Sequence, residues 1–426
     1  MTALRRLVGG TFGSLAVRNY RLYFFGQVVS VSGSWMQRIA QSWLVLHLTG
    51  SGVALGAVSA LQFLPVLLLG AWGGLVADRF DKRRVLLGTQ AAMGVLALGL
   101  ALATLSGVVN VVMVYAFALA LGFVAAIDMP ARQAFVMEMV GRKHIINAVS
   151  LNSAVFTSAR VIGPALAGVL ISVAGTGWCF LINAASFLAV LLALAAMNPL
   201  ELHRSVPTAP GRGQLRAGIS YAWDNREVRA LLLIIASVGT LALNFNVILP
   251  LVARNTFHGD ATTFGLLFST LGIGSLAGAL FTASRRTIGW PGLLGALLVF
   301  GLCLLGAAVA PSLIWELLVL IPLGVASLAF QATVNSTLQL RIDAAFRGRV
   351  MALYGVVFVG STPFGSLLVG WVAEHYGPRS GFVLAGVSVL LTGLVATYWW
   401  RRQRQGGAAR ASGETWRGEL RDRPAS

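Results

Sequence analysis

Long apolar stretches separated by short polar turns fill most of the chain. From Val85 to Ile127 there is no Asp, Glu, Lys or Arg, and this length is enough for two membrane spans of roughly twenty residues each. The apolar stretches and the breaks between them predict twelve spans. These are 21–48, 53–77, 84–106, 110–131, 146–174, 178–197, 229–252, 262–283, 290–310, 313–340, 349–374 and 380–400.

Each span is predicted to be an α-helix, because an isolated strand in lipid leaves its backbone N–H and C=O groups unpaired. We therefore expect an all-α polytopic membrane protein with twelve transmembrane helices. A polar break after the sixth span predicts two six-helix halves. The expected parts are an N-terminal segment, 1–20, the first half, 21–197, a central loop, 198–228, the second half, 229–400, and a disordered basic tail, 401–426.

One further element is predicted inside the central loop. Apolar residues recur there at helical spacing, namely Leu215, Ile219, Ala222 and Trp223. This pattern indicates a short helix at the membrane interface.

Composition supports a membrane protein, since 57% of the residues are hydrophobic and 11% are charged, against about a quarter charged in soluble domains. The net charge of +18 could indicate nucleic-acid binding. However, 28 of the 32 Lys and Arg lie on one side of the predicted bundle, and only Arg254 and Arg379 lie on the other. The positive-inside rule then predicts a multi-pass protein of the cell (inner) membrane with both termini, the central loop and the tail in the cytoplasm. No folded basic domain remains, so we expect no nucleic-acid partner.

Catalytic signatures are missing from the sequence. It contains no His-Glu-x-x-His, no Gly-x-Ser-x-Gly and no Gly-x-x-x-x-Gly-Lys-Ser/Thr pattern, which are typical of zinc, serine and nucleotide chemistry. None of the five histidines is paired at ligand spacing. We therefore expect no enzymatic activity, no cofactor and no metal site.

Two arginines lie well inside predicted spans, where a charge is costly and usually faces a cavity or a partner. Arg38 lies in the first span, on one helical face with Gln27, Ser34 and Gln41. Arg160 lies in the fifth span. Two arginines without a deep carboxylate in this half favour an anionic or polyphenolic substrate. Alternatively, each arginine pairs with backbone carbonyls or with an acid such as Asp128.

The second half contributes neutral polar residues to the candidate cavity. Asn244 and Asn246 lie in the seventh span, and Gln331 and Asn335 lie four residues apart in the tenth. These residues either line a substrate cavity or make hydrogen bonds between helices without touching substrate. Glycines in the second, eighth and eleventh spans indicate places where helices cross closely. At such smooth contacts one half could rock against the other.

Two motifs carry a family resemblance. The turn after the second span reads Gly74-Leu-Val-Ala-Asp78-Arg79-Phe80-Asp81-Lys82-Arg83, and the fifth span contains Gly163-Pro164-Ala-Leu-Ala-Gly168. Both resemble motifs of the major facilitator superfamily, although Asp81 replaces a glycine and the second motif is one glycine short. Four further stretches are similar to the branch that contains the enterobactin exporter and macrolide efflux proteins: Ser34–Trp43, Leu48–Ser51, Pro130–Gln133 and Arg347–Met351.

The resemblance implies the major facilitator fold, with a cavity lined by the first, fourth, seventh and tenth helices. It also implies a gating network. Asp78 would cap the start of the eleventh helix near 348–351, and an ion network would latch the outward-facing state. The expected members of this network are Gly74, Asp78, Arg79, Arg83, Asp128 and Arg132. Alternatively, the basic residues only set topology, and Asp128 and Arg132 form a local pair four residues apart on one helix.

The predicted function is secondary active export of an amphiphilic small molecule, either a drug-like compound or a siderophore. Antiport against protons is implied by the resemblance, with Asp128 as the candidate proton carrier and Glu316 and Glu374 as weaker ones. The antiporter-like motif of Gly163, Pro164 and Gly168 favours export. An importer on the same fold and a membrane sensor or assembly factor that does not transport remain alternatives. The expected partners are the substrate, protons and the lipid bilayer, and the expected state is a monomer.

Overall fold

The structure, a computed structural model, describes residues 12–203, 214–284, 289–343 and 346–421, and within these ranges it contains helices and no strand. The α-helices are α2 (Arg18–Thr49), α3 (Gly52–Arg79), α4 (Lys82–Leu105), α5 (Val111–Ala174), α6 (Thr176–Ala195), α7 (Gln214–Asp224), α8 (Arg226–Ala242), α9 (Phe245–Leu251), α10 (Ala261–Ser284), α11 (Trp290–Ala308), α12 (Leu313–Arg341), α13 (Arg347–Tyr376) and α14 (Arg379–Arg421). Short helices η1 (Gly13–Ala16), η2 (Pro199–Glu201) and η3 (Val252–Thr256) complete the set. The all-α prediction is confirmed.

Ten helical segments of the described chain are long and apolar enough to cross a membrane. One of them, α5, has 64 residues and contains a break at Gly141, whose φ of 64° lies in the left-handed region. Glycine adopts this conformation without a steric penalty, so α5 consists of two helices joined at a sharp turn. Counting α5 twice gives eleven spans. The 32-residue α2 is long enough to be a twelfth, but its polar residues keep its hydropathy low. The number twelve therefore stays a prediction.

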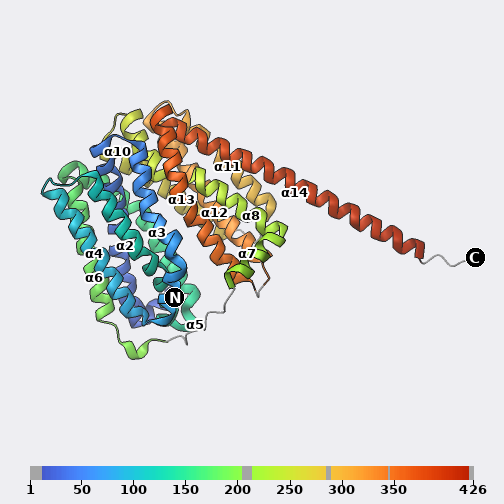
Figure 1. Cartoon of the computed structure of the whole chain (residues 1–426), viewed down its shortest axis with the longest axis horizontal. Coiled ribbons are helices and arrows are strands. Elements are labelled where there is room, and N and C mark those ends of the chain that lie inside the picture. Colours follow the sequence, from blue (N-terminus) through green and yellow to red (C-terminus); the bar gives the residue numbers. More distant parts are fainter. Residues whose placement is uncertain (1–11, 204–213, 285–288, 344–345, 422–426) are drawn as a thin grey trace, which may run out of the picture.

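The helices pack into two groups that lie side by side (Figure 1). In the first group, α3 packs on α5, α4 on α6, and α2 on both α5 and α6. In the second group, α10 packs on α12, α11 on α14, and α8 on α13. Two helix pairs, α3 with α13 and α5 with α10, make most of the contact between the groups. Any cavity between the groups is therefore bordered by these two pairs.

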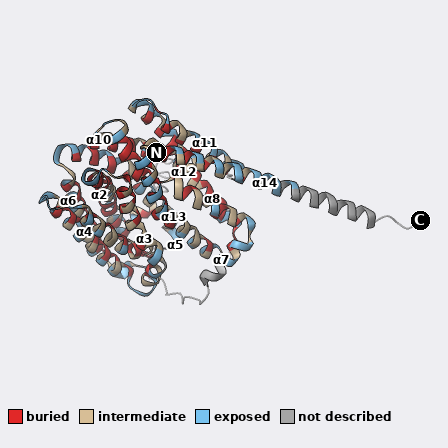
Figure 2. Ribbon diagram, turned by 45° about the horizontal axis from the view of Figure 1, so that its top comes forward, coloured by how far each residue is buried: buried red, intermediate tan, exposed pale blue. Residues whose placement is uncertain are grey.

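Burial follows this arrangement. Buried residues concentrate where helices face one another, and exposed residues lie on the outside of the bundle (Figure 2). Many of the exposed side chains are large and apolar, for example Val95 and Leu102 on α4 and Leu188 and Leu192 on α6. An apolar surface of this extent suits contact with lipid, since soluble proteins rarely expose large contiguous apolar patches.

Some boundaries differ from those predicted. Regular structure begins at η1, before the predicted end of the N-terminal segment, because Ser14 is buried and bonded through its backbone N–H to the Asn147 side chain at 2.9 Å. The predicted short helix of the central loop is present as α7. The structure differs from the expected disorder of the tail, since α14 continues to Arg421. Arg, Gln and Ala, which are frequent in this segment, have high helix propensity.

Candidate functional site

The two ends of the bundle are distinguished by their charge. We call the end with the start of α2 and the turn 79–84 the basic end, and the end with the turn 49–51 the opposite end. Helix α3 runs from the opposite end to the basic end, and α13 runs the other way. Contacts along these two helices therefore report how the groups approach each other at each end.

At the opposite end, the two groups are in close backbone contact. A methyl group at Gly52 would meet the carbonyl oxygen of Gly370, and one at Gly56 would meet that of Ser366. The Ser366 hydroxyl donates a hydrogen bond of 3.0 Å to the Gly56 carbonyl. Helices approach this closely only where small residues line both surfaces. The deepest glycine contact of this seam is between Gly360 and Leu67.

The second pair of helices makes a similar seam. Gly168 on α5 lies against Ala261 and Gly265 on α10, and the Ser269 hydroxyl donates to the Val161 carbonyl at 2.9 Å. Gly272 lies against the backbone of Arg160. Each of these contacts is on the opposite-end side of, or level with, Arg160.

Toward the basic end, the close contacts between α3 and α13 stop. A methyl group at Gly74 on α3, or at Gly348 or Gly355 on α13, would meet no atom within 4 Å. Asp78 is exposed, and it has no hydrogen-bond or ion-pair partner among the described residues. The groups are thus joined at the opposite end and apart at the basic end.

Arg38 and Arg160 lie near each other, because both face one aromatic ring. The guanidinium carbon of Arg38 is 4.4 Å from the centroid of the Trp35 ring, and that of Arg160 is 5.9 Å from it. Both Nε atoms are buried and have no hydrogen-bond partner among the described residues. Cation–π contact with the indole offsets only part of the cost of removing these two cations partly from water. A negatively charged ligand would complete this site.

Aromatic side chains of the two groups pack against each other near the two arginines. Trp35 packs on Phe268 with ring centroids 6.0 Å apart, and Trp43 stacks on Phe264 at 6.1 Å. Both pairs join α2 of the first group to α10 of the second. On α5, Ser153 is exposed and lies on the helical face of Arg160 toward the basic end. An exposed polar face on a membrane-spanning helix indicates access to water from that end.

The other predicted cavity residues divide into two sets. Gln41 and Asn246 each keep a buried polar atom, Nε2 and Oδ1 respectively, without a partner in the described chain. The remaining ones have hydrogen-bond partners nearby in the chain. Ser34 donates to the Ser30 carbonyl, Asn244 to the Thr240 carbonyl, Gln331 to the Ser327 carbonyl, and Asn335 accepts from Gln339. Gln41 and Asn246 are therefore the better candidates for contact with a ligand.

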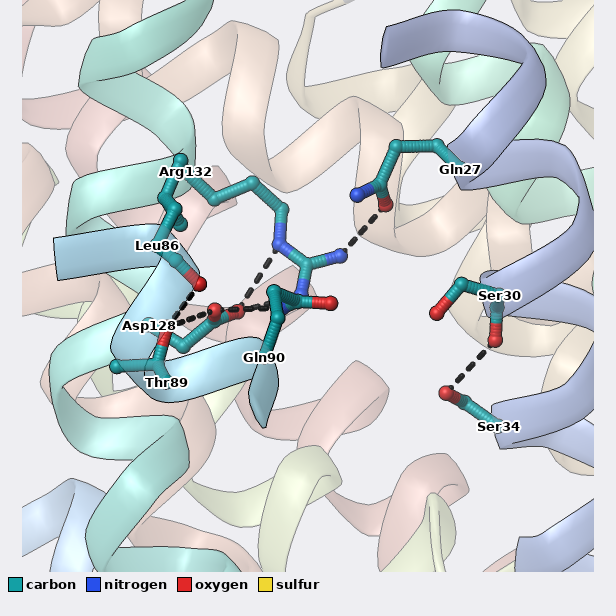
Figure 3. Close-up of polar contacts among 8 residues, drawn as sticks. All are labelled: Gln27, Ser30, Ser34, Leu86, Thr89, Gln90, Asp128 and Arg132. Atoms are coloured by element: carbon teal, nitrogen blue, oxygen red, sulfur yellow. Dashed lines mark hydrogen bonds and ion pairs between the residues drawn. The ribbon is translucent and has the colours of Figure 1, made fainter. Parts of the chain in front are cut away.

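Gln27 belongs to a different cluster, centred on Asp128 and Arg132 (Figure 3). Arg132 donates to Oδ2 of Asp128 from Nη2 at 2.5 Å and from Nε at 3.0 Å, and from Nη1 to Gln27 at 2.7 Å. Thr89 and Gln90 of α4 donate to the other carboxylate oxygen at 2.8 and 2.7 Å. The local pair predicted as an alternative is present, and it joins α2, α4 and α5 of the first group.

The other expected members of the gating network lie outside this cluster. Arg79 is exposed near Asp78. Arg83 donates to the carbonyls of Leu194 and Ala195 at 2.7 and 3.1 Å, which places a cation at the end of α6, where the helix dipole is negative. The structure does not bring Asp78, Arg79 and Arg83 together with Asp128.

The family described as transmembrane secretion effector matches residues 9–423. The chain belongs to this family. Among curated relatives, the staphyloferrin A transporter of Staphylococcus aureus is 26% identical over 387 residues, which is 88% of this chain and 94% of the relative. The multidrug efflux pump Tap of Mycolicibacterium fortuitum is 27% identical, with 88% and 94% covered, and the enterobactin exporter of Citrobacter koseri is 24% identical, with 88% and 90% covered.

Solved structures agree on the fold. The nucleoside transporter NupG superposes with a TM-score of 0.71 at 14% identity, covering 91% of this chain and 99% of that one. A bacterial homologue of the iron transporter ferroportin, in an inward-facing state, gives 0.70 at 16% identity with 90% and 98% covered. The predicted major facilitator fold is confirmed, and this member of the secretion effector family is a membrane transporter rather than an enzyme.

In this family member, the predicted Gly163-Pro164 motif lies where three helices cross. A methyl group at Gly163 would meet Trp35 of α2, while Gly265 of α10 lies against the Pro164 carbonyl. The motif thus lets α5 approach both Trp35 of α2 and helix α10 of the second group.

Sequence reasoning missed several residues of these clusters. Trp35, which contacts both arginines, was not predicted, nor were Thr89 and Gln90, which donate to Asp128. It also missed a buried ion pair at the basic end, in which Lys82 Nζ and Glu138 Oε1 are 2.7 Å apart. Glu138 within an otherwise apolar stretch was the available signal, since a buried acid needs a partner.

Proposed function

We propose that the chain is a secondary active exporter that moves an amphiphilic, negatively charged small molecule out of the cytoplasm by alternating access. One observation carries the proposal: the guanidinium groups of Arg38 and Arg160, each with a buried Nε atom, face Trp35 without an acid of the described chain to pair them. Buried cations in a transporter mark the path of the cargo. An aromatic ring between them suits a ligand with a flat or apolar part.

Orientation is part of the proposal. The basic end, with both termini, faces the cytoplasm of a cell (inner) membrane, because basic residues accumulate there by 28 to two. With this orientation the structure is inward-facing, closed on the extracellular side by the glycine seams and the aromatic layer. The two six-helix halves, 21–197 and 229–400, would rock about this site, with 198–228 as their connection.

Proton coupling completes the proposed cycle. Asp128 is 1% exposed, and its carboxylate accepts four hydrogen bonds, two from Arg132 and one each from Thr89 and Gln90. Protonation of Asp128 would weaken its hold on Arg132 and free a cation next to Gln27 of α2. Three relatives whose names describe a siderophore transporter, an efflux pump and a siderophore exporter support an export role. We expect the protein to act as a monomer without cofactor.

The test measures accumulation in cells that lack their own exporters. A fluorescent dye and a catecholate siderophore are supplied with the wild type and with Arg38→Ala. Lower accumulation of the siderophore with the wild type, abolished by a protonophore and by Arg38→Ala, is the expected result. Uptake into inside-out vesicles, in which export appears as accumulation, separates an exporter from an importer. Failure of purified protein to bind or move any anionic amphiphile would overturn the proposal.

A further inference from the structure

The short turn between α2 and α3, at the extracellular end in the proposed orientation, is held by charged residues of the second group. The Glu374 carboxylate of α13 accepts a hydrogen bond of 2.5 Å from the Ser51 hydroxyl and one of 2.8 Å from the Val53 backbone N–H. Ser51 in turn accepts from the Ala54 N–H at 3.1 Å. Glu374 thereby caps the start of α3 across the boundary between the groups.

The end of α2, on the other side of the same turn, has a cap of opposite charge. Arg254, in the π-helical turn η3, donates from Nη1 to the carbonyl oxygen of Leu46 in the last turn of α2. An anion at a helix start and a cation at a helix end are both favourable, because the helix dipole is positive at its start and negative at its end. Both helix ends at this turn therefore receive the matching charge, and both charges come from the second group.

The position of Glu374 mirrors that of Asp78. Helices α3 and α13 lie antiparallel along the seam, and each has a carboxylate in its last turn or at its end, Asp78 on α3 and Glu374 on α13. In this structure Glu374 reaches the start of α3, while Asp78 is exposed and without a partner in the described chain. If Asp78 caps the start of α13 in the outward-facing state, as the resemblance implies, the two caps form in alternate states of one cycle.

We infer that Glu374 and Arg254 form a clamp on the turn between α2 and α3, which holds the extracellular gate closed and must be released in every transport cycle. The inference rests on the proposed alternating access. It makes these two residues positioning residues that set the balance between inward- and outward-facing states. Neither lies beside Arg38 and Arg160, so they have no part in holding the substrate.

The chain offers matched controls for both charges. Arg379 donates to the Ala310 carbonyl at 2.5 Å, and Asp260 accepts from the Thr263 N–H at 3.0 Å. That backbone hydrogen bond holds the pKa of the Asp260 carboxyl below its usual value. Both residues cap helices of their own group at the same end of the molecule. Their loss removes a similar charge and hydrogen bond without loosening the boundary between the groups.

The experiment follows thiol accessibility in the full chain. Cys179 and Cys303 are replaced by serine, and Ser366→Cys is introduced as a reporter. Ser366 suits this purpose because it is only 1% exposed and lies against Gly56 in the extracellular seam. A membrane-impermeant maleimide is added outside intact cells. We expect the pair Glu374→Gln and Arg254→Gln to raise the labelling rate by about tenfold or more, because it weakens three charge-assisted hydrogen bonds, to Ser51, Val53 and Leu46. The control pair Asp260→Asn and Arg379→Gln should leave it within about twofold.

A second reporter distinguishes gating from unfolding. Ser153→Cys lies on the exposed face of α5 on the cytoplasmic side of Arg160, and it is labelled in inside-out vesicles. The clamp requires labelling there to fall when labelling at position 366 rises. A rise at both positions, or no difference between the clamp and control pairs, would overturn the inference. Because labelling needs no substrate, a shifted balance without transport of any compound would leave the clamp standing and refute the proposed function.

Discussion

Arg38 is stacked 4.4 Å above the ring of Trp35, with its Nε buried and unpaired in the described chain. If an anionic substrate completes this site, Arg38→Gln removes a charged donor from its ligand. Hydrogen bonds to charged groups contribute about 1.5–3 kcal/mol, so the KM for an anionic substrate should rise by about tenfold or more. The measurement is initial transport rate against substrate concentration in proteoliposomes.

The control for this variant is Arg38→Lys, which keeps the charge but loses the planar fork. It should retain part of the affinity, because lysine still attracts an anion without bidentate geometry. A cationic dye, if it is transported at all, should be moved no worse by Arg38→Gln than by wild type. Equal loss for anionic and cationic compounds would instead mean that Arg38 holds the helices in place.

Asp128 and Arg132 allow a prediction on stability. Asp128→Asn presents an amide N–H or a single acceptor where Arg132 now makes two hydrogen bonds to Oδ2. Arg132 would be left as a largely buried charge, since its side chain is 19% exposed. Removing one partner of a buried pair costs about 3–5 kcal/mol, and partial exposure puts this variant at the lower limit. Thermal unfolding in detergent should show a clearly lower midpoint.

The double variant Asp128→Asn with Arg132→Gln is the matched control. It removes both charges, so the unpaired cation no longer exists and much of the lost stability should return. If the single and double variants unfold at the same temperature, the contacts of Thr89, Gln90 and Gln27 matter more than the ion pair. The proton-carrier proposal for Asp128 is tested separately, by whether transport of Asp128→Asn still responds to a pH gradient.

The sequence predicts the fold well because membrane helices are encoded by local hydropathy. The boundaries of α3, α4, α6 and α12 follow the apolar stretches closely, since a helix in lipid has to satisfy its own backbone. The first span was predicted, like the others, from its apolar residues and the breaks around it, although the polar residues of α2 keep its hydropathy low. The tail after residue 401 was predicted less well, because helix propensity rather than apolar burial decides its state.

Partners across helices are harder to predict than spans. Nothing local indicates that Thr89 and Gln90 bond to Asp128, some forty residues away, or that Arg38 and Arg160 face the same ring of Trp35. These contacts depend on helix rotation and tilt, which are set by packing. Asp78 shows a second limit, because the role expected for it belongs to a state that the structure does not adopt.

Asp78 therefore leads to a prediction that separates stability from function. It has no partner in this state, so Asp78→Asn should change thermal stability by no more than about 0.5 kcal/mol. Transport should nevertheless fall severely, because the outward-facing state would lose the cap at the start of α13. Labelling of the Ser366→Cys reporter from outside should fall as well. Asp81→Asn is the control, since Asp81 caps α4 through Arg84 N–H at 3.0 Å and Asn caps helices equally well.

Three glycines on α3 face three different surroundings and allow one comparison. A methyl group at Gly74 would meet nothing within 4 Å, one at Gly73 would meet the Ala126 carbonyl of the same group, and one at Gly56 would meet the Ser366 carbonyl of the other group. Gly74→Ala should leave stability unchanged or raise it, because alanine is the better helix former by about 1 kcal/mol. Gly73→Ala should lower the unfolding midpoint, since overpacking costs about 1–3 kcal/mol.

Gly56→Ala should behave differently, because its clash can be relieved by separating the two groups. Moving α3 and α13 apart at the opposite end would disfavour one conformation of the protein without unfolding it. We therefore expect Gly56→Ala to speed the labelling, by a reagent added outside the cell, of a cysteine reporter in the second seam, between α5 and α10. The loss of thermal stability should be smaller than for Gly73→Ala. If Gly56→Ala instead unfolds the protein as readily as Gly73→Ala does, the seam is a fixed part of the core, and the groups do not rock about it.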